Sequence, residues 1–184
     1  MALTRLGLNQ SINLASNVTG TLATGNGGTG ATSFAPGKIA QIVEDSATGH
    51  STINSTSYGD ISLQATITPS ATTSKVLVMA NLNNIKINSS SGGNVQMRIQ
   101  HDQGGSSFTN LAEYEGVAGY NDNDVNNFSP MFLHSPNTTN AIIYKVQAAT
   151  LTGFSDGSAR FNNRNGDGGY IRSSLILIEV LAWL

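Results

Sequence analysis

Apolar residues recur at every second position in several short segments of this chain, and clusters of turn-forming residues separate these segments. The pattern is clearest in residues 61–67 and 95–101, where Ile, Leu, Ala, Val and Met alternate with polar residues. Successive side chains of a strand point to opposite faces of a sheet, so this alternation buries one face. No helical periodicity extends beyond about one turn. The chain is therefore predicted to be an all-β protein.

About nine or ten short strands separated by turns favour a β-sandwich or jelly roll over an alternating strand–helix fold. The expected strands cover residues 39–44, 61–67, 75–80, 95–101, 111–117, 128–134, 141–149, 153–161 and 170–183, and residues 45–59 are expected to form a polar link. The strand at 75–80 is nearly all apolar, which predicts a central strand buried on both faces. It is expected to continue through Leu82 to Ile85 and Ile87 after a bulge at Asn83-Asn84.

Composition excludes several classes of protein. Apolar residues make up 39% of the chain, which is unlike disorder caused by high charge, and the net charge of −2 gives no basic surface for nucleic acid. Cysteine is absent, so disulfides are excluded. No apolar segment reaches the roughly 20 residues that cross a bilayer, and the first residues lack the apolar core of a secretory signal. We therefore expect a protein made in a cytoplasm, with no membrane partner.

Residues 1–37 differ from the rest and are expected to form an extended N-terminal arm, with residues 38–184 forming the β domain. Between residues 15 and 34 the chain carries five glycines, each of which disfavours a helix by roughly 1 kcal/mol. Pro36-Gly37 is typical of a boundary. The apolar residues of the arm stand mostly at even intervals, and we expect other chains to bury them: Leu6, Leu8, Ile12, Leu14, Val18 and Leu22.

Two segments of the arm carry a resemblance to a known family. Residues 17–22, Asn-Val-Thr-Gly-Thr-Leu, and residues 27–33, Gly-Gly-Thr-Gly-Ala-Thr-Ser, closely resemble a segment that recurs in the tail fibres of tailed bacteriophages. Residues 67–79 and 169–180 look like strand elements of small structural proteins of phages. The resemblance implies a protein of the virion surface, made in the cytoplasm of a host bacterium. It also implies a trimeric jelly roll like those of tumour-necrosis-factor and complement-type domains, attached to the virion by its arm.

The closing strand fits this expectation in one of two ways. Leu175, Leu177 and Glu179 share one face, and the opposite face carries Ile176, Ile178 and Val180. Such a strand is too apolar for a solvated sheet edge. It is expected either near a threefold axis or as a buried central strand of the monomer.

Residues with catalytic or metal-binding chemistry are scattered. His50, His101 and His134 have no metal-binding spacing, and structural roles are expected for them. No Gly-X-Ser-X-Gly motif occurs. Glu113 and Glu115 share a strand face without forming a convincing catalytic pair. The sequence therefore predicts no enzyme activity, no cofactor and no metal site.

Two polar loops, at residues 119–127 and 162–169, are the expected contact surfaces, because binding residues often lie on loops held by a rigid scaffold. Residues 121–127 are rich in the oxygen ligands that Ca²⁺ prefers, but their spacing departs from an EF-hand and a polar turn is the preferred interpretation. The residues expected to contact a receptor are Tyr120, Asn121, Asp122, Asp124, Arg164 and Asp167.

The leading hypothesis is a structural component of a tailed phage virion, a homotrimeric short tail fibre or a capsid decoration or head-fibre protein. Its partners would be further copies of itself and other virion proteins. One alternative is a carbohydrate-binding module that recognises a host surface glycan. Another is a polysaccharide depolymerase, for which the carboxylates give no persuasive support. Tail and capsid placement are both left open.

Overall fold

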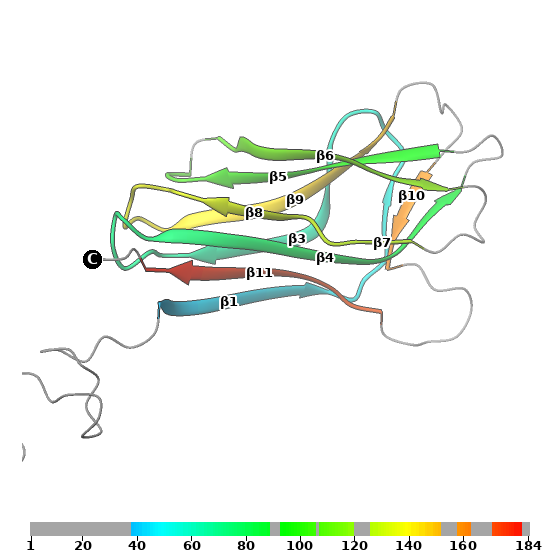
Figure 1. Cartoon of the computed structure of the whole chain (residues 1–184). Coiled ribbons are helices and arrows are strands. Elements are labelled where there is room, and N and C mark those ends of the chain that lie inside the picture. The colour runs from blue at the N-terminus through cyan, green and yellow to red at the C-terminus, as the bar shows by residue number, and fades with distance from the viewer. Residues whose placement is uncertain are drawn as a thin grey trace, which may run out of the picture. The chain divides into compact units, whose positions relative to one another are not determined.

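The computed structural model describes residues 38–88, 93–105, 107–119, 126–151, 158–162 and 171–181, with the backbone alone at 88 and 116–119. These residues form an all-β fold, as predicted (Figure 1). Its strands are β1 (Ile39–Ala47), β2 (Ser51–Ile53), β3 (Gly59–Ile67), β4 (Lys75–Asn88), β5 (Gly93–Asp102), β6 (Thr109–Gly119), β7 (Asn126–Phe128), β8 (Met131–His134), β9 (Ile142–Thr150), β10 (Ser158–Phe161) and β11 (Ser173–Val180). No helix that could cross a membrane occurs in this part of the chain.

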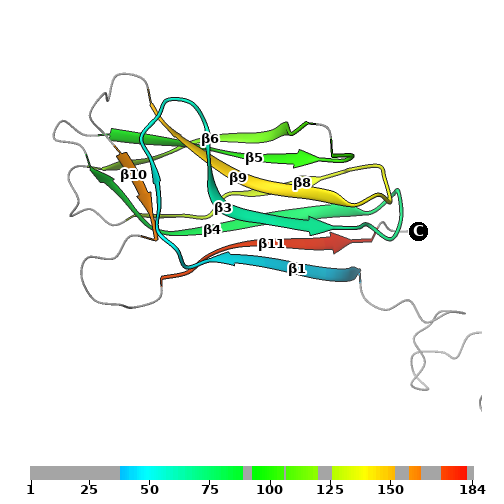
Figure 2. The same ribbon diagram turned by 180° about the vertical axis from the view of Figure 1, so that it is seen from behind.

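Two antiparallel sheets pack against each other as a β-sandwich (Figures 1 and 2). The first has the order β1-β11-β4-β10-β2, and β7 and β8 also pair with β4. The second has the order β3-β9-β5-β6. The 14-residue strand β4 connects the first sheet, because its first half pairs with β11 and β8 and its second half with β7 and β10.

The core lies between the sheets and is filled by the alternating residues that the sequence indicates. In β3, the inward residues are Ile61, Leu63, Ala65 and Ile67, each at most 5% exposed. Side chains of β4, β5, β9 and β11 meet them from the other strands. Burial of each large apolar side chain stabilises the fold by about 1.5–3 kcal/mol. This alternation fixes which side chains face outward.

The bulge predicted in β4 is present. Asn84 has a φ of 51°, and the register against β7 shifts between Leu82 and Ile85. Up to Leu82, the even-numbered apolar residues of β4 face the core. Beyond the bulge, Ile85 and Ile87 face it instead. The bulged backbone is held by side chains, since Ser173 Oγ accepts from the Asn83 amide at 2.9 Å and Asn127 Oδ1 from the Asn84 amide at 3.0 Å.

Several strand predictions were wrong in detail. Residues 51–53 form β2 within the segment expected as a polar link, and Ile53 joins the core. The strand expected over 128–134 is divided into β7 and β8. Pro130, which has no amide hydrogen to donate, stands between them, and its carbonyl accepts from Ala80 N at 3.0 Å. The closing strand covers Ser173–Val180, so the described residues 171, 172 and 181 of the expected range 170–183 lie outside it.

Strands β4 and β11 are central, as predicted, but β4 is fully buried on one face only. Val76 and Val78 are completely buried, whereas Leu77 and Met79 on the opposite face are half-buried. Burial on both faces was therefore wrong for a single chain. The expected arm of residues 1–37, with Leu6, Leu8, Ile12, Leu14, Val18 and Leu22, lies outside the described residues.

Candidate functional site

The expected receptor-contact residues lie outside the described part of the chain. They are Tyr120, Asn121, Asp122, Asp124, Arg164 and Asp167. Of the expected loop 119–127, Gly119 ends β6 and Asn126 and Asn127 belong to β7, so the loop prediction was wrong for these three residues. Residues 120–125 and 163–169 lie outside the described part of the chain and stay predictions. Among the residues that the structure describes, no three His, Cys, Asp or Glu side chains are grouped in a way that could hold a metal ion.

The outer surface of the first sheet is crossed by two rows of mainly apolar side chains. The strand register aligns Ile42 of β1, Ile178 of β11, Leu77 of β4 and Leu133 of β8 in one row. It aligns Glu44, Ile176, Met79 and Met131 in the next. The residues between these rows, including Leu177 and Val78, point into the core. We call the seven apolar members of the two rows the apolar outer face.

Three of these side chains are highly exposed for their type: Ile42 at 61%, Met131 at 60% and Leu133 at 50%. Leu77, Met79, Ile176 and Ile178 lie between them and are half-buried by their neighbours within the sheet. The next row is polar, with Ser46, Ser174 and Asn81 in register. The row on the other side is mixed, with Ile39, Val180 and Lys75 in register and Ile39 exposed. Single exposed apolar residues are ordinary, but a contiguous apolar patch marks an interaction surface.

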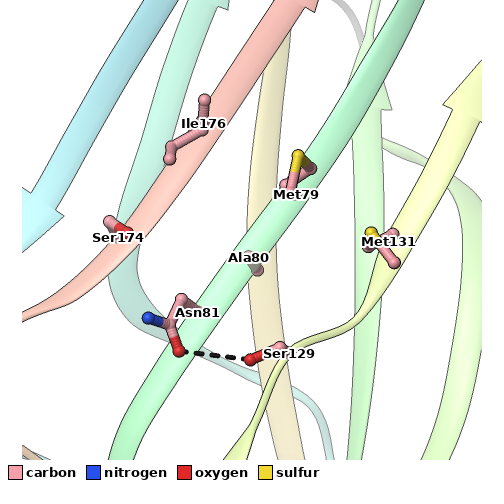
Figure 3. Close-up of a pocket in the computed structure, with 7 residues that line it drawn as sticks. All are labelled: Met79, Ala80, Asn81, Ser129, Met131, Ser174 and Ile176. Atoms are coloured by element: carbon pink, nitrogen blue, oxygen red, sulfur yellow. Dashed lines mark hydrogen bonds between the residues drawn. The ribbon is translucent and has the colours of Figure 1, made fainter.

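A hollow of about 410 Å³ lies at the boundary between the apolar rows and the polar row (Figure 3). Met79, Met131 and Ile176 line its apolar side, and Asn81, Ser129 and Ser174 its polar side. Ser129 Oγ lies 3.2 Å from Asn81 Oδ1. Methionine side chains adapt to irregular partners because they are unbranched and flexible. The hollow is therefore suited to an apolar side chain from another molecule.

The outer surface of the second sheet is polar and internally bonded. Arg98 of β5 donates from Nε and Nη2 to Gln147 Oε1 at 2.8 and 2.6 Å. Gln147 Nε2 in turn donates to Asp60 Oδ1 at 2.7 Å, and Lys145 Nζ lies 3.1 Å from the same oxygen. Burial raises the pKa of Asp60. The hydrogen bonds from Gln147 and Lys145, together with the nearby positive charges, lower this pKa by a larger amount, so the net shift is downward.

Polar groups also join the two sheets at the edge of the core. His134 of β8, Tyr144 of β9 and His101 of β5 form a cluster, with 4.5 Å between the imidazole centroids. Burial lowers the pKa of His134 to about 4, and the neighbouring His101 contributes in the same direction. These contacts give His101 and His134 structural roles.

Glu179 is a fully buried carboxylate at one end of the sandwich. Its oxygens accept hydrogen bonds from Ser70 N at 2.7 Å, from Ser70 Oγ at 2.6 Å and from Gln41 Nε2 at 2.6 Å. Burial raises the pKa of Glu179, but the hydrogen bonds from Ser70 and Gln41 outweigh it and the net shift is downward. These hydrogen bonds stabilise the charged carboxylate, and they connect β1 and the β3–β4 turn to β11.

No protein-family model matches this chain, and no curated protein matches it. The sequence indicated the part of the apolar outer face that lies on β4 and β11, but its extension to Ile42, Met131 and Leu133 was not predicted. Residues 75–80 and 173–180 are apolar at positions of both parities, which indicates two covered faces. The core of the single chain covers one of them.

Proposed function

We propose that this chain is a non-enzymatic structural subunit of a tailed-phage virion, assembled as a homotrimer through the apolar outer face. The observation that carries the proposal is the pair of apolar rows across β1, β11, β4 and β8. Water contact with these side chains is unfavourable, and burying each exposed one contributes about 1.5–3 kcal/mol. Ile42, Met131 and Leu133 have the most to gain.

Further copies of the same chain are the partner that the face fits. Homo-oligomers commonly close by rotational symmetry, and a ring joins two different parts of the same surface. Here Ile42 lies at the β1 side of the face and Met131 and Leu133 at the β8 side. In a three-membered ring, the β1 side of one copy would meet the β8 side of the next. The exposed charges near the face, Glu44 and Lys75, are of opposite sign and can be matched between copies.

Placement on a virion is supported by the sequence resemblance of residues 17–22 and 27–33 to tail fibres. A trimeric sandwich with an attachment arm suits both a short tail fibre and a capsid decoration or head-fibre protein. The arm, through the six apolar residues named above, would bind other virion proteins.

Sedimentation velocity of the full chain tests the assembly. The wild type is expected to be a trimer at micromolar concentration, and the double variant Ile42→Lys/Met131→Lys is expected to be a monomer with an unchanged circular dichroism spectrum. Thr66→Lys, at an exposed position on β3 in the second sheet, is the control and should stay trimeric. A monomeric wild type, or a double variant that stays trimeric, would contradict the proposal.

A further inference from the structure

A second surface of the molecule has the features of a ligand site. On the second sheet, a groove of about 250 Å³ is lined by Tyr58, Gln96, Glu113, Tyr114 and Glu115, and we call it the polar groove. The register of β5 against β6 pairs Gln96 with Glu115 and Arg98 with Glu113. The two glutamates are exposed on the outer surface of β6. The Tyr114 side chain points toward the first sheet, where its hydroxyl donates to Met131 O at 2.8 Å. The groove therefore presents carboxylates, an amide and the aromatic ring of Tyr58 together.

The groove is preorganised by contacts beneath and beside it. The Arg98 guanidinium lies 4.1 Å from the centroid of the Tyr58 ring, and the bonds from Arg98 to Gln147 hold it there. Asn110 Nδ2 donates to Glu113 Oε1 at 2.7 Å, and Asn110 Oδ1 accepts from Gln100 at 2.7 Å. Groups fixed before binding lose less entropy when a ligand arrives.

Two groups of the groove keep hydrogen-bonding capacity for a ligand. Within the described part of the chain, neither the Glu115 carboxylate nor the Gln96 side-chain amide has a side-chain hydrogen-bond partner. A carboxylate accepts hydrogen bonds, and an amide both donates and accepts them. A ligand that fits must therefore supply several donors and at least one acceptor within a short distance.

The charges around the groove disfavour anionic ligands. Glu113 and Glu115 repel an anion, and the Arg98 guanidinium already occupies one side of the Tyr58 ring where a cation would bind. Burial is the largest cause of a raised pKa at Tyr58, and both glutamates raise this pKa as well. The Tyr58 hydroxyl therefore stays protonated. A simple cation would be attracted by the two glutamates but would leave the Gln96 side-chain N–H groups without an acceptor, whereas a neutral ligand with many hydroxyl groups supplies both donors and acceptors.

We infer that the polar groove binds a neutral saccharide. Sugar hydroxyls would donate to Glu115 and Glu113 and pair with the Gln96 amide, and the Tyr58 ring would give the apolar side of the sugar an amphipathic surface to pack against. The groove lies on the second sheet and the apolar outer face on the first, with the core between them. Binding at the groove therefore leaves the proposed trimer surface free, and the inference does not depend on the trimer.

The test uses the full chain and a panel of methyl glycosides of neutral hexoses and N-acetylhexosamines, followed by their short oligomers. Saturation-transfer NMR detects binding and calorimetry measures affinity. At least one saccharide should bind, and Tyr58→Ala and Glu115→Gln should each weaken it about tenfold or more. Arg172→Gln, at an exposed position before β11, is the control and should not change it. Inorganic phosphate and choline serve as charged probes and should not compete.

Three results would overturn the inference: no saccharide of the panel binds, binding is unchanged in both groove variants, or phosphate or choline displaces the sugar. If Tyr58→Ala lowers the melting temperature, Glu115→Gln alone decides, because that side chain is exposed and isosteric with its replacement. Sedimentation of the same samples keeps this outcome separate from the trimer. A monomer that binds sugar through the groove refutes the assembly proposal and supports this one.

Discussion

His134 Nδ1 and the hydroxyl oxygen of Tyr144 are 2.7 Å apart, and this contact joins the two sheets of the sandwich. His134 belongs to β8 of the first sheet and Tyr144 to β9 of the second. Tyr144 is fully buried, and burial raises the pKa of its hydroxyl. Protonation of the imidazole would place a positive charge beside His101 in a partly desolvated position.

Stability is therefore expected to fall on acidification. The pKa of His134 is about 4 in the folded protein, against 6.5 for an unperturbed histidine. Between these values the unfolded chain binds a proton that the folded chain does not, so the free energy of unfolding decreases as pH falls from 6.5 to 4. Burial also lowers the pKa of His101, although Asp102 opposes this shift. We expect a loss of about 1–3 kcal/mol, reduced from the full linkage value by partial exposure.

Urea titrations at a series of pH values measure this dependence. His134→Gln should flatten the slope between pH 6.5 and 4, whereas His50→Gln, at an exposed position between β1 and β2, should leave it unchanged. Equal slopes in wild type and His134→Gln would show that the histidine cluster does not cause the acid sensitivity.

Glu179→Gln is expected to destabilise the fold by about 1.5–3 kcal/mol, the usual contribution of hydrogen bonds to a charged group. In Glu179 both carboxylate oxygens accept hydrogen bonds, one from Ser70 and the other from Gln41. The glutamine amide has only one oxygen that accepts, so it cannot keep both sets of bonds. Because the pKa of Glu179 is lowered on folding, its contribution is complete above the unfolded value and is lost as pH falls through the folded one. The two proteins should therefore converge in melting temperature at pH values well below 4.5. A constant difference at all pH values would assign the effect to packing.

The bulge in β4 gives a prediction about backbone conformation. Asn84 adopts a φ of 51°, which a β-branched residue tolerates poorly. Asn84→Val should cost about 1–3 kcal/mol, whereas Asn84→Gly should be close to neutral. Chemical denaturation of the two variants checks this order, and a Val variant as stable as the Gly variant would refute the strain argument.

The arm gives a prediction about attachment. Removing residues 1–37 should abolish incorporation into virions, because the arm's spaced apolar residues are proposed to bind other virion proteins. Purified particles analysed by mass spectrometry would measure incorporation, and circular dichroism would confirm that residues 38–184 still fold. Truncated protein found on particles at the wild-type level would show that the arm is not the anchor.

Much of the fold follows from local pattern. The alternation in residues 61–67 and the switch in phase at Asn83-Asn84 predict which residues enter the core, because a strand has a fixed period of two. Strand β2 was missed because three residues with one apolar side chain give no measurable period. The interruption at Pro130 was missed although its missing amide hydrogen provides a direct physical reason.

The two candidate surfaces depend on register, which the sequence does not give. Ile42 and Leu133 lie in one row only because β1, β11, β4 and β8 pair as they do. Similarly, Arg98 and Gln147 are 49 positions apart and meet through the pairing of β5 with β9. Chemistry assembled from distant strands has no short motif to reveal it.

The position of β11 has a consequence for the order of events during synthesis. Among the strands that the structure describes, this one is the last to leave the ribosome, yet it fills the place between β1 and β4. Until it arrives, β1 lacks the strand to which it pairs, and neither apolar row is continuous. Such long-range pairing slows folding and delays the native surface. Nascent chains therefore cannot join one another through the complete surface before β11 has been made, which protects a crowded polysome from premature association.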